Sequence, residues 1–138
     1  VYRAMKEGEL IHRVRRPHGI TKATTEIQEK ENIIKRDFTS AAPMEKLLTD
    51  ITEVQCADGK LYVAAVLDCY NGEIIGLAMD NNMRKELCIH AFCSACQAQG
   101  ASGMILHSDR GSQFTSADFR KVLARYGAVQ SMSGTGRC

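Results

Sequence analysis

Two short turn signals divide the middle of the chain into three apolar stretches, and they restrict the possible folds more than any other feature. Asp58-Gly59 and Asn71-Gly72 are residue pairs that tight two-residue hairpin turns favour, and apolar runs flank each of them. We therefore predict three consecutive antiparallel strands, at residues 47–55, 61–69 and 73–79. The middle strand is almost continuously apolar, which predicts that both of its faces are covered.

The second half of the chain changes from strand patterns to alternating helices and strands. Apolar residues at helical spacing predict a helix over residues 84–99, and a second helix, capped by Thr115 and Ser116, over residues 115–126. Short apolar runs at residues 104–107 and 128–132 predict two more strands. A strand, helix, strand order implies crossovers and parallel pairing. We therefore predict an α/β fold, a mixed five-stranded sheet of three antiparallel strands and two parallel additions, with helices available to both faces.

The first 36 residues lack a sustained apolar period and differ in charge from the rest. They hold nine Lys and Arg against five Glu, a net charge of +4, whereas residues 37–138 carry −2. We predict a basic arm or linker at 1–36 and one folded domain at 37–138, with Ile33, Ile34 and Phe38 as a small apolar anchor onto it. A basic arm fits a polyanionic ligand, although from charge alone a solvated tail is the simpler explanation.

The composition excludes several classes of protein. With 44% hydrophobic and 25% charged residues, the chain is typical of a globular domain. No apolar run approaches the roughly 20 residues of a membrane helix, and the opening residues lack a signal-peptide core, so we expect no membrane partner and a cytoplasmic location. A start at Val1 suggests a fragment. The six cysteines mostly lie in apolar segments, as buried reduced thiols do, although Cys93 and Cys96, with Cys88 and His90 nearby, allow a weaker zinc interpretation.

Asp50 is a carboxylate in the middle of an otherwise apolar, β-branched run. Asp is depleted from strands and a buried unpaired carboxylate is costly, so Asp50 needs a basic partner, water at the strand end, or a metal ion. Asp109 stands where another apolar strand turns into a polar loop. If the first and fourth strands are neighbours, the two carboxylates converge, and a cation between them lets both stay ionised. Oxygen ligands of this kind suit Mg²⁺ or Mn²⁺ better than zinc.

The residues around both aspartates resemble a known family. Thr49-Asp50-Ile51-Thr52 and the run from His107 to Phe114 are similar to the two Asp motifs of bacterial insertion-sequence transposases of the retroviral-integrase superfamily, and the likeness covers about residues 30–138. The resemblance implies a ribonuclease-H-like fold with a catalytic triad of two Asp and one Glu that binds two divalent cations, Mg²⁺ or Mn²⁺. It also implies DNA transposition by metal-dependent phosphodiester cleavage and strand transfer.

Carried over to this sequence, the resemblance makes Asp50 and Asp109 the catalytic and metal-binding acids. The candidate DNA contacts are His107, Arg110 and Gln113 beside the second Asp, and Arg15, Arg16, Lys35 and Arg36 further upstream. For Gln113 a loop-capping role is an equal alternative. The family's Glu lies on a helix beyond Cys138, so we expect a fold truncated before that helix and an isolated chain that is inactive.

The sequence offers two other acids and two other functions as alternatives. Asp68, on the neighbouring strand, is the better structural substitute for the missing carboxylate, whereas Asp118 is expected to be a first-turn acid favoured by the helix dipole. The resemblance implies transposon-end and target DNA as partners and a homo-oligomer for the full-length protein. The alternatives are an inactive remnant that binds DNA or full-length transposase, and a nuclease acting on RNA–DNA hybrids.

Overall fold

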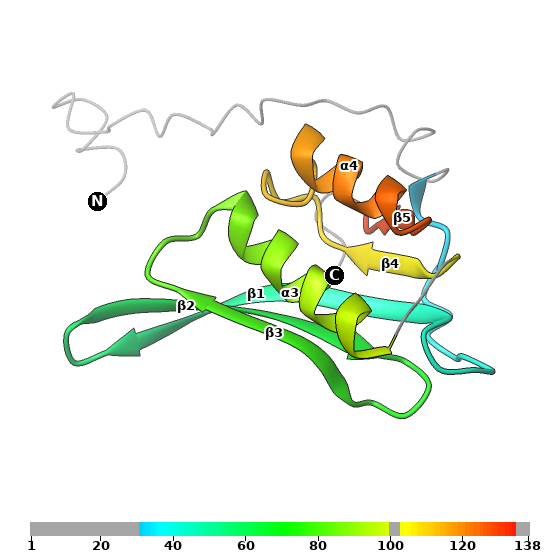
Figure 1. Ribbon diagram of the computed structural model, residues 1–138, viewed down its shortest axis with the longest axis horizontal. Helices are drawn as coiled ribbons and strands as arrows, with labels where there is room; N and C mark the ends of the chain where they lie inside the picture. The colour runs from blue at the N-terminus through cyan, green and yellow to red at the C-terminus, as the bar shows by residue number, and fades with distance from the viewer. Residues whose placement is uncertain (1–30, 100–102, 135–138) are drawn as a thin grey trace, which may run out of the picture.

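The structure is a computed structural model that describes residues 31–99 and 103–134 (Figure 1). The elements in chain order are β1 (Lys46–Cys56), β2 (Gly59–Asp68), β3 (Ile74–Asp80), α3 (Lys85–Gln99), β4 (Ile105–Ser108), α4 (Ala117–Arg125) and β5 (Val129–Met132). They form one five-stranded sheet with the strand order β3-β2-β1-β4-β5. The sequence prediction of a mixed α/β sheet is confirmed.

The pairing directions follow from the connections. β1, β2 and β3 pair antiparallel, because short hairpin connections join them, whereas β4 pairs parallel with both β1 and β5 after helical crossovers. Gly72 has φ 75°, a left-handed conformation that glycine adopts without a Cβ penalty, in the predicted Asn-Gly turn. Both hairpins lie at the predicted positions, but the first turn is Ala57-Asp58, because Cys56 pairs with Gly59, and the second connection, residues 69–73, is longer than the predicted two residues.

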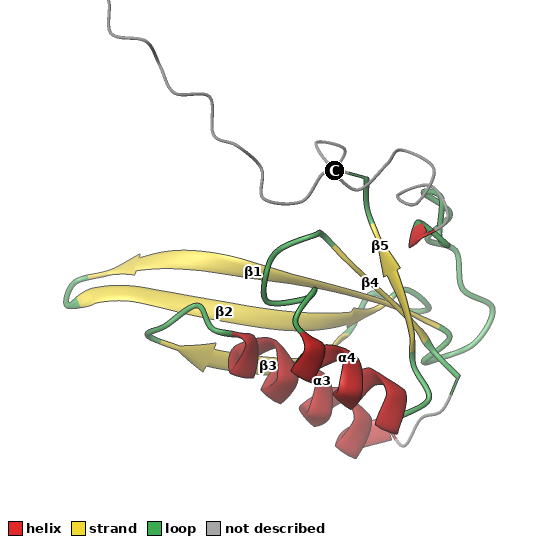
Figure 2. Ribbon diagram, turned by 90° about the horizontal axis from the view of Figure 1, so that it is seen from above, coloured by secondary structure: helices red, strands yellow, loops and turns green. Residues whose placement is uncertain are grey.

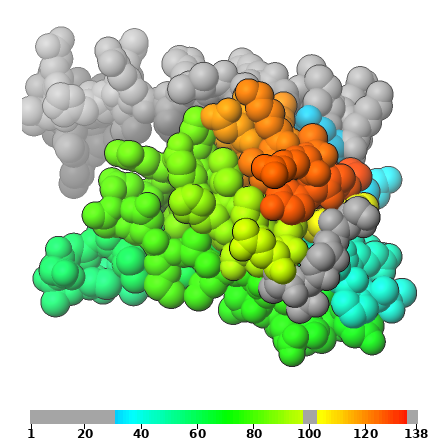
Figure 3. Space-filling view, in the orientation of Figure 1, coloured from blue at the N-terminus to red at the C-terminus, as the bar shows by residue number. Residues whose placement is uncertain are grey.

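Both described helices lie on the same face of the sheet (Figure 2). Leu47, Ala64, Val66 and Leu106 point from the strands into the core beneath them. α3 and α4 pack side by side over this core, as the space-filling view also shows (Figure 3). Within the described residues, this arrangement leaves the other face of the sheet without a covering helix.

The prediction that β2 is covered on both faces is therefore wrong for the part of the chain that the structure describes. Ala64 and Val66 are buried, but Val63 and Leu67, which alternate with them, are only half-buried. Met79, which pairs with Val63 on the neighbouring strand β3, is 58% exposed. The sequence shows that β2 is apolar, but it does not show which face of the strand the helices cover.

Gly76 allows β3 to approach α3 closely. A Cβ at this position would meet the Ala91 carbonyl oxygen and would lie 2.8 Å from the Cβ of Ala95. Two atoms at such separations overlap, so a side chain larger than hydrogen would force the helix away from the sheet. The close approach keeps the core beneath α3 filled.

One of the two residues predicted to cap α4 does so. Ser116 is the N-cap and its hydroxyl accepts a hydrogen bond from the Phe119 backbone N–H at 3.3 Å. Thr115 is not the cap, and its hydroxyl donates instead to the Gly111 carbonyl oxygen at 3.2 Å. Asp118 lies in the first turn, as expected, and pairs with Lys85 at the start of α3.

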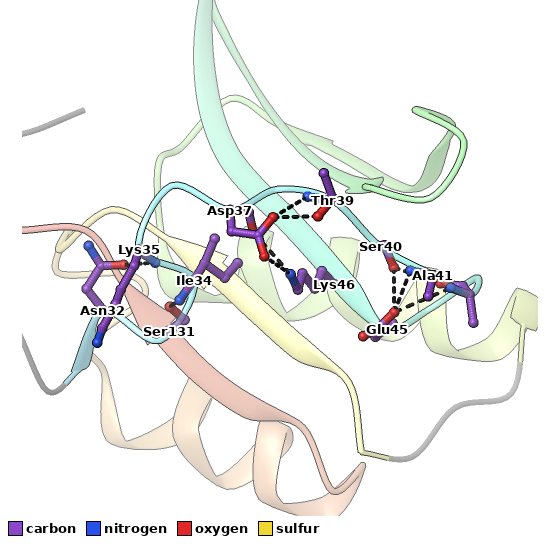
Figure 4. A network of polar contacts seen from close by, with 11 residues as sticks. Asn32, Ile34, Lys35, Asp37, Thr39, Ser40, Ala41, Glu45, Lys46 and Ser131 are labelled. Atoms are coloured by element: carbon purple, nitrogen blue, oxygen red, sulfur yellow. Dashed lines mark hydrogen bonds and ion pairs between the residues drawn. The ribbon is translucent and has the colours of Figure 1, made fainter.

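The segment before β1 is fastened to the sheet by polar contacts (Figure 4). Ile34 is buried, whereas Ile33 and Phe38 are 43% and 45% exposed, so only one of the three predicted anchor residues lies in the interior. Asp37 accepts hydrogen bonds from Thr39 and pairs with Lys46 at 3.1 Å. These hydrogen bonds and the Lys46 charge lower the pKa of the exposed Asp37 carboxyl to about 2.

Among the helices that the structure describes, none has the length and apolarity that crossing a membrane would require. The predicted domain boundary at residue 36 stays a prediction, because residues 1–30, which include Arg15 and Arg16, lie outside the described part of the chain.

Candidate metal-binding site

The parallel pairing of β1 and β4 brings the two predicted acids to the same place. Leu48 on β1 is paired with His107 on β4, and Asp50 and Asp109 each follow two residues further along. Because side chains alternate along a strand, Asp50 lies on the face of Leu48 and His107, opposite the helices. Asp109 directly follows the end of β4, beside the middle of β1, and it lines the same cavity as Asp50, Leu48 and His107.

A cavity of about 410 Å³ contains both acids. Its lining residues come from the three central strands, the loop after β4 and the segments at the two ends of the described chain: Phe38, Leu48, Thr49, Asp50, Ala65, Leu67, His107, Ser108, Asp109 and Ser133. Apart from the two carboxylates and the histidine, the lining is apolar or hydroxylic. The cavity therefore surrounds an acidic pair with mostly neutral walls.

Each carboxylate has one oxygen held in place by the backbone. Oδ1 of Asp109 accepts a hydrogen bond from the Gly111 N–H at 2.9 Å, and Oδ1 of Asp50 accepts one from the Ile51 N–H at 2.8 Å. The second oxygen of each has no hydrogen-bond partner among the described residues. Two carboxylate oxygens with open positions are a donor set that fits a hard divalent cation such as Mg²⁺. Nowhere in residues 31–99 and 103–134 do three or more His, Cys, Asp or Glu side chains gather as a metal group.

Asp68 does not belong to this pair, so its expected use as a substitute for the third carboxylate is wrong. It is paired with Leu47 across the sheet and therefore lies on the helix-covered face, where it is 2% exposed. Its Oδ2 accepts a hydrogen bond from the Met44 N–H at 2.8 Å and its Oδ1 accepts one from the Tyr70 N–H at 2.9 Å. Asp68 is thus a structural carboxylate that holds two backbone segments together.

His107 lies between the acidic pair and β5. Its Nδ1 is 2.9 Å from the hydroxyl oxygen of Ser131, and the Phe38 ring packs edge-on against it with centroids 6.2 Å apart. Burial lowers the pKa of His107 below its usual value near 6.5, so the imidazole is neutral at pH 7. The ring is a wall of the cavity with a defined orientation.

Arg110, a predicted DNA contact, is engaged by the protein itself. Its Nε donates to the Ser133 carbonyl oxygen at 2.8 Å, and its Nη1 pairs with the Glu31 carboxylate at 2.6 Å. The guanidinium is only partly accessible, since 18% of the side chain is exposed. In this structure Arg110 fastens the loop after Asp109 to residues 31 and 133.

Of the other predicted DNA contacts, Lys35, Arg36 and Gln113 belong to the described residues, and none of the three lines the acidic cavity. Gln113 donates to the Met83 carbonyl oxygen at 3.3 Å and lines a second hollow, of about 390 Å³, with Arg84 and Lys85. Lys35 and Arg36 are exposed, with φ values of 49° and 69°. Contact with DNA stays a prediction for all of these residues.

Two of the three cysteines of α3 are interior thiols, and Cys93 is half-buried. Cys88 and Cys96 are buried and carry no disulfide. Burial raises the pKa of Cys96 to about 11, and burial together with the negative charge of Asp109 raises that of Cys88 to about 12. Both are therefore protonated at neutral pH and act as small apolar side chains.

Ser131 is the site residue that sequence reasoning missed. It is fully buried, and it contacts His107 on the neighbouring strand and the backbone of residues 33 and 34. A serine in a short strand carries no sequence signal for these contacts, because its partners lie 24 to 98 positions away along the chain. Only the folded arrangement identifies it.

Comparison with known proteins agrees with this architecture. The family model described as "Integrase core domain" matches residues 40–138. An uncharacterised transposase-like protein of Haemophilus influenzae is 38% identical over 108 residues, which cover 78% of this chain and 50% of the relative. A transposase for insertion sequence IS3A of Escherichia coli is 35% identical over 109 residues, 78% of this chain and 38% of the relative. The chain thus spans half or less of the length of these relatives.

Solved structures show the same fold. The catalytic core domain of the integrase of HTLV-2, solved in complex with magnesium as a dimeric form, superposes with a TM-score of 0.59 at 19% identity, covering 67% of this chain and 62% of that one. The simian T-cell lymphotropic virus intasome gives 0.60 at 14% identity, with 68% and 33% covered. The ribonuclease-H-like fold implied by the sequence motifs is confirmed. With a family model that matches most of its residues and transposases among its relatives, the chain belongs to the integrase core domain family.

Proposed function

We propose that this chain is the catalytic-core portion of a transposase, and that it serves DNA transposition by metal-dependent cleavage and joining of phosphodiester bonds. The observation that carries the proposal is that Asp50 and Asp109, from adjacent parallel strands, line one cavity on one face of the sheet. Membership of the integrase core domain family supports the same reaction class. The DNA partners would be transposon ends and target DNA, bound by an oligomer of the full-length protein.

Asp50 and Asp109 would hold Mg²⁺ or Mn²⁺ through the carboxylate oxygens that have no partner among the described residues. When bound, divalent ions supply the positive charge that phosphoryl transfer needs at its attacking and leaving oxygens. Magnesium accompanies the HTLV-2 integrase core in its solved structure, which supports the choice of ion. The chemistry of the donor set favours the same ions, because both ligands are hard oxygens.

The protein's own contribution is the orientation of the pair. The N–H groups of Ile51 and Gly111 each hold one carboxylate oxygen, which restricts the rotation of both side chains and leaves the other oxygen available to a ligand. Arg110 fixes the loop after Asp109 through Ser133 and Glu31, so that loop is positioned before any ligand binds. Such preorganisation reduces the free energy that binding must otherwise spend on ordering side chains.

The proposal is tested by locating a bound divalent ion in the 138-residue protein. Mn²⁺ added in small amounts broadens NMR signals of nuclei near its site, so we expect the loss of signals from residues that line the cavity. Asp50→Asn and Asp109→Asn are each expected to abolish this selective broadening, because each removes one of two ligands. Mg²⁺ is expected to compete with Mn²⁺ and restore the signals.

Asp58→Asn is the matched control, because it removes one exposed carboxylate far from the cavity and Asn is accepted in turns as readily as Asp. It is expected to leave the broadening unchanged. Broadening that persists in both Asp50→Asn and Asp109→Asn, or that is centred elsewhere on the protein, would contradict the assignment of the site.

A further inference from the structure

The buried hydroxyl of Ser131 is in contact with three nitrogen atoms. The backbone nitrogens of Ile33 and Ile34 lie 3.0 Å and 3.4 Å from its oxygen, and Figure 4 shows Ile34 beside Ser131. The third nitrogen is Nδ1 of His107, at 2.9 Å. These contacts join three segments that are distant in sequence, at the wall of the cavity that holds the acidic pair.

The hydrogen-bonding capacity of a hydroxyl decides the direction of the third contact. A serine hydroxyl has two acceptor positions and one donor. The N–H groups of Ile33 and Ile34 can only donate, so they occupy both acceptor positions. The Ser131 proton is then left for Nδ1 of His107, which must accept it and must itself be unprotonated. A neutral imidazole with an unprotonated Nδ1 carries its proton on Nε2.

We propose that Ser131 fixes His107 in the tautomer with the proton on Nε2, and that this N–H donates a hydrogen bond to an oxygen of the phosphodiester bound at Asp50 and Asp109. His107 lines the same cavity as the two acids, and its Nε2 has no hydrogen-bond partner among the described residues. Ser131 is then a positioning residue that acts through His107. The part concerning the phosphodiester rests on the proposed function, whereas the tautomer does not.

The tautomer distinguishes two roles that His107 could have beside a carboxylate pair. Two carboxylates and an imidazole are a common ligand set for transition metals, but a ligating ring nitrogen must be unprotonated. Nδ1 is occupied by the Ser131 hydroxyl, and Nε2 carries the proton. His107 is therefore a donor toward the anionic substrate and not a third metal ligand.

The first test is an NMR measurement of the ring nitrogens of ¹⁵N-labelled protein without metal or DNA, with His107 identified by the signals that disappear in His107→Gln. We expect a protonated Nε2 and an unprotonated, hydrogen-bonded Nδ1, and we expect added Mg²⁺ to leave the Nε2 proton in place. A solvated imidazole populates both tautomers, so Ser131→Ala is expected to introduce the Nδ1–H form, whereas Ser131→Thr, which keeps the hydroxyl, is not.

Either of two results would overturn the tautomer assignment. One is a protonated Nδ1 in the wild-type protein, and the other is the loss of the Nε2 proton when Mg²⁺ binds. The wild-type spectrum decides both, so the test does not depend on whether Ser131→Ala folds. A Ser131→Ala protein that folds and keeps a pure Nε2–H tautomer would show that Ser131 does not fix the ring.

The second test measures binding of a short DNA duplex in the presence of Mg²⁺. His107→Leu removes the donor, whereas His107→Gln places an amide N–H near the position of Nε2. We expect His107→Leu to weaken Mg²⁺-dependent binding about tenfold, as for a hydrogen bond to a charged group, and His107→Gln to retain most of the affinity. Mn²⁺ broadening at the acidic pair should be unchanged in both variants.

Equal affinities for the Leu and Gln variants and the wild type would overturn the role of His107 toward the phosphodiester. Loss of Mn²⁺ binding in His107→Leu would instead make the histidine a metal ligand and would overturn the donor role. If the wild-type protein shows no Mg²⁺-dependent DNA binding at all, the proposed function fails, and the tautomer measured in the first test is unaffected.

Discussion

Asp68 offers a direct test of which acids belong to the site, because it is a strand carboxylate on the face opposite the cavity. It is 2% exposed and accepts hydrogen bonds from the N–H groups of Met44 and Tyr70, at 2.8 Å and 2.9 Å. Asp68→Asn keeps the shape of the side chain and replaces one carboxylate oxygen with an NH₂ group. That group can accept no hydrogen bond, so one of the two backbone N–H groups loses its partner.

The expected loss follows from these two contacts. A hydrogen bond to a charged group contributes about 1.5–3 kcal/mol, and the orphaned N–H is buried beside another donor. We therefore expect the free energy of unfolding to fall by about 2–3 kcal/mol, a large part of the 5–15 kcal/mol typical of a domain. With a urea m-value of about 1–3 kcal/mol/M, the unfolding midpoint should fall by about 0.7–3 M.

The assay pairs urea unfolding with Mn²⁺ broadening, in Asp68→Asn and in Asp109→Asn. The Asp68 variant should lose stability and keep the metal site, whereas the Asp109 variant should keep its stability within about 0.5 kcal/mol, as exposed substitutions do, and lose the metal site. The reasoning is refuted if Asp68→Asn removes the broadening while its unfolding midpoint stays at the wild-type value.

Three further predictions follow from the packing and the charges. Gly76→Ala should lower the free energy of unfolding by about 2–3 kcal/mol, measured in urea, because its Cβ would overlap the Ala91 carbonyl oxygen, and an unchanged midpoint would show that α3 can move away freely. Cys88, whose pKa burial raises to about 12, should resist iodoacetamide at pH 8 in the folded protein and react once urea unfolds it, as mass spectrometry would show; rapid labelling of the folded protein would contradict its burial. The pKa of Asp37 is lowered to about 2 in the folded state, so its pairing with Lys46 should stabilise the protein above about pH 4 and lose that effect as the pH falls toward 2. The wild-type protein and Asp37→Asn, compared by urea unfolding, should differ at pH 6 and converge near pH 2, and a difference that grows on acidification would have the wrong sign.

Local chemistry made much of the fold predictable from the sequence. The two hairpins lie where the Asp58-Gly59 and Asn71-Gly72 signals predicted them, because turn conformations depend mainly on the residues within the turn, although the first turn is one residue earlier and the second connection is longer than two residues. The spacing of apolar residues in α3 and the Ser116 cap of α4 likewise depend on neighbours a few positions away. The strand, helix, strand order then limited β4 and β5 to parallel pairing.

The position of the acidic pair could be predicted only in part. Asp50 stood out as a carboxylate in an apolar strand, and Asp109 as one at the end of another, but their convergence depended on β1 and β4 being neighbours. Asp68 gave a similar sequence signal and lies on the other face, since its position relative to β1 sets the direction of its side chain. A strand pattern cannot by itself say which face meets the helices.

The positions of the hairpins, the order of helices and strands, and the two acids beside apolar runs are all readable from the sequence, because each depends on residues close together in the chain. The tertiary structure alone decided which face of the sheet the helices cover, that Asp68 holds the backbone of Met44 and Tyr70, and that Ser131 binds His107. Those contacts join residues 24 or more positions apart, apart from the local bond to Tyr70, and the packing of the strands and helices brings them together.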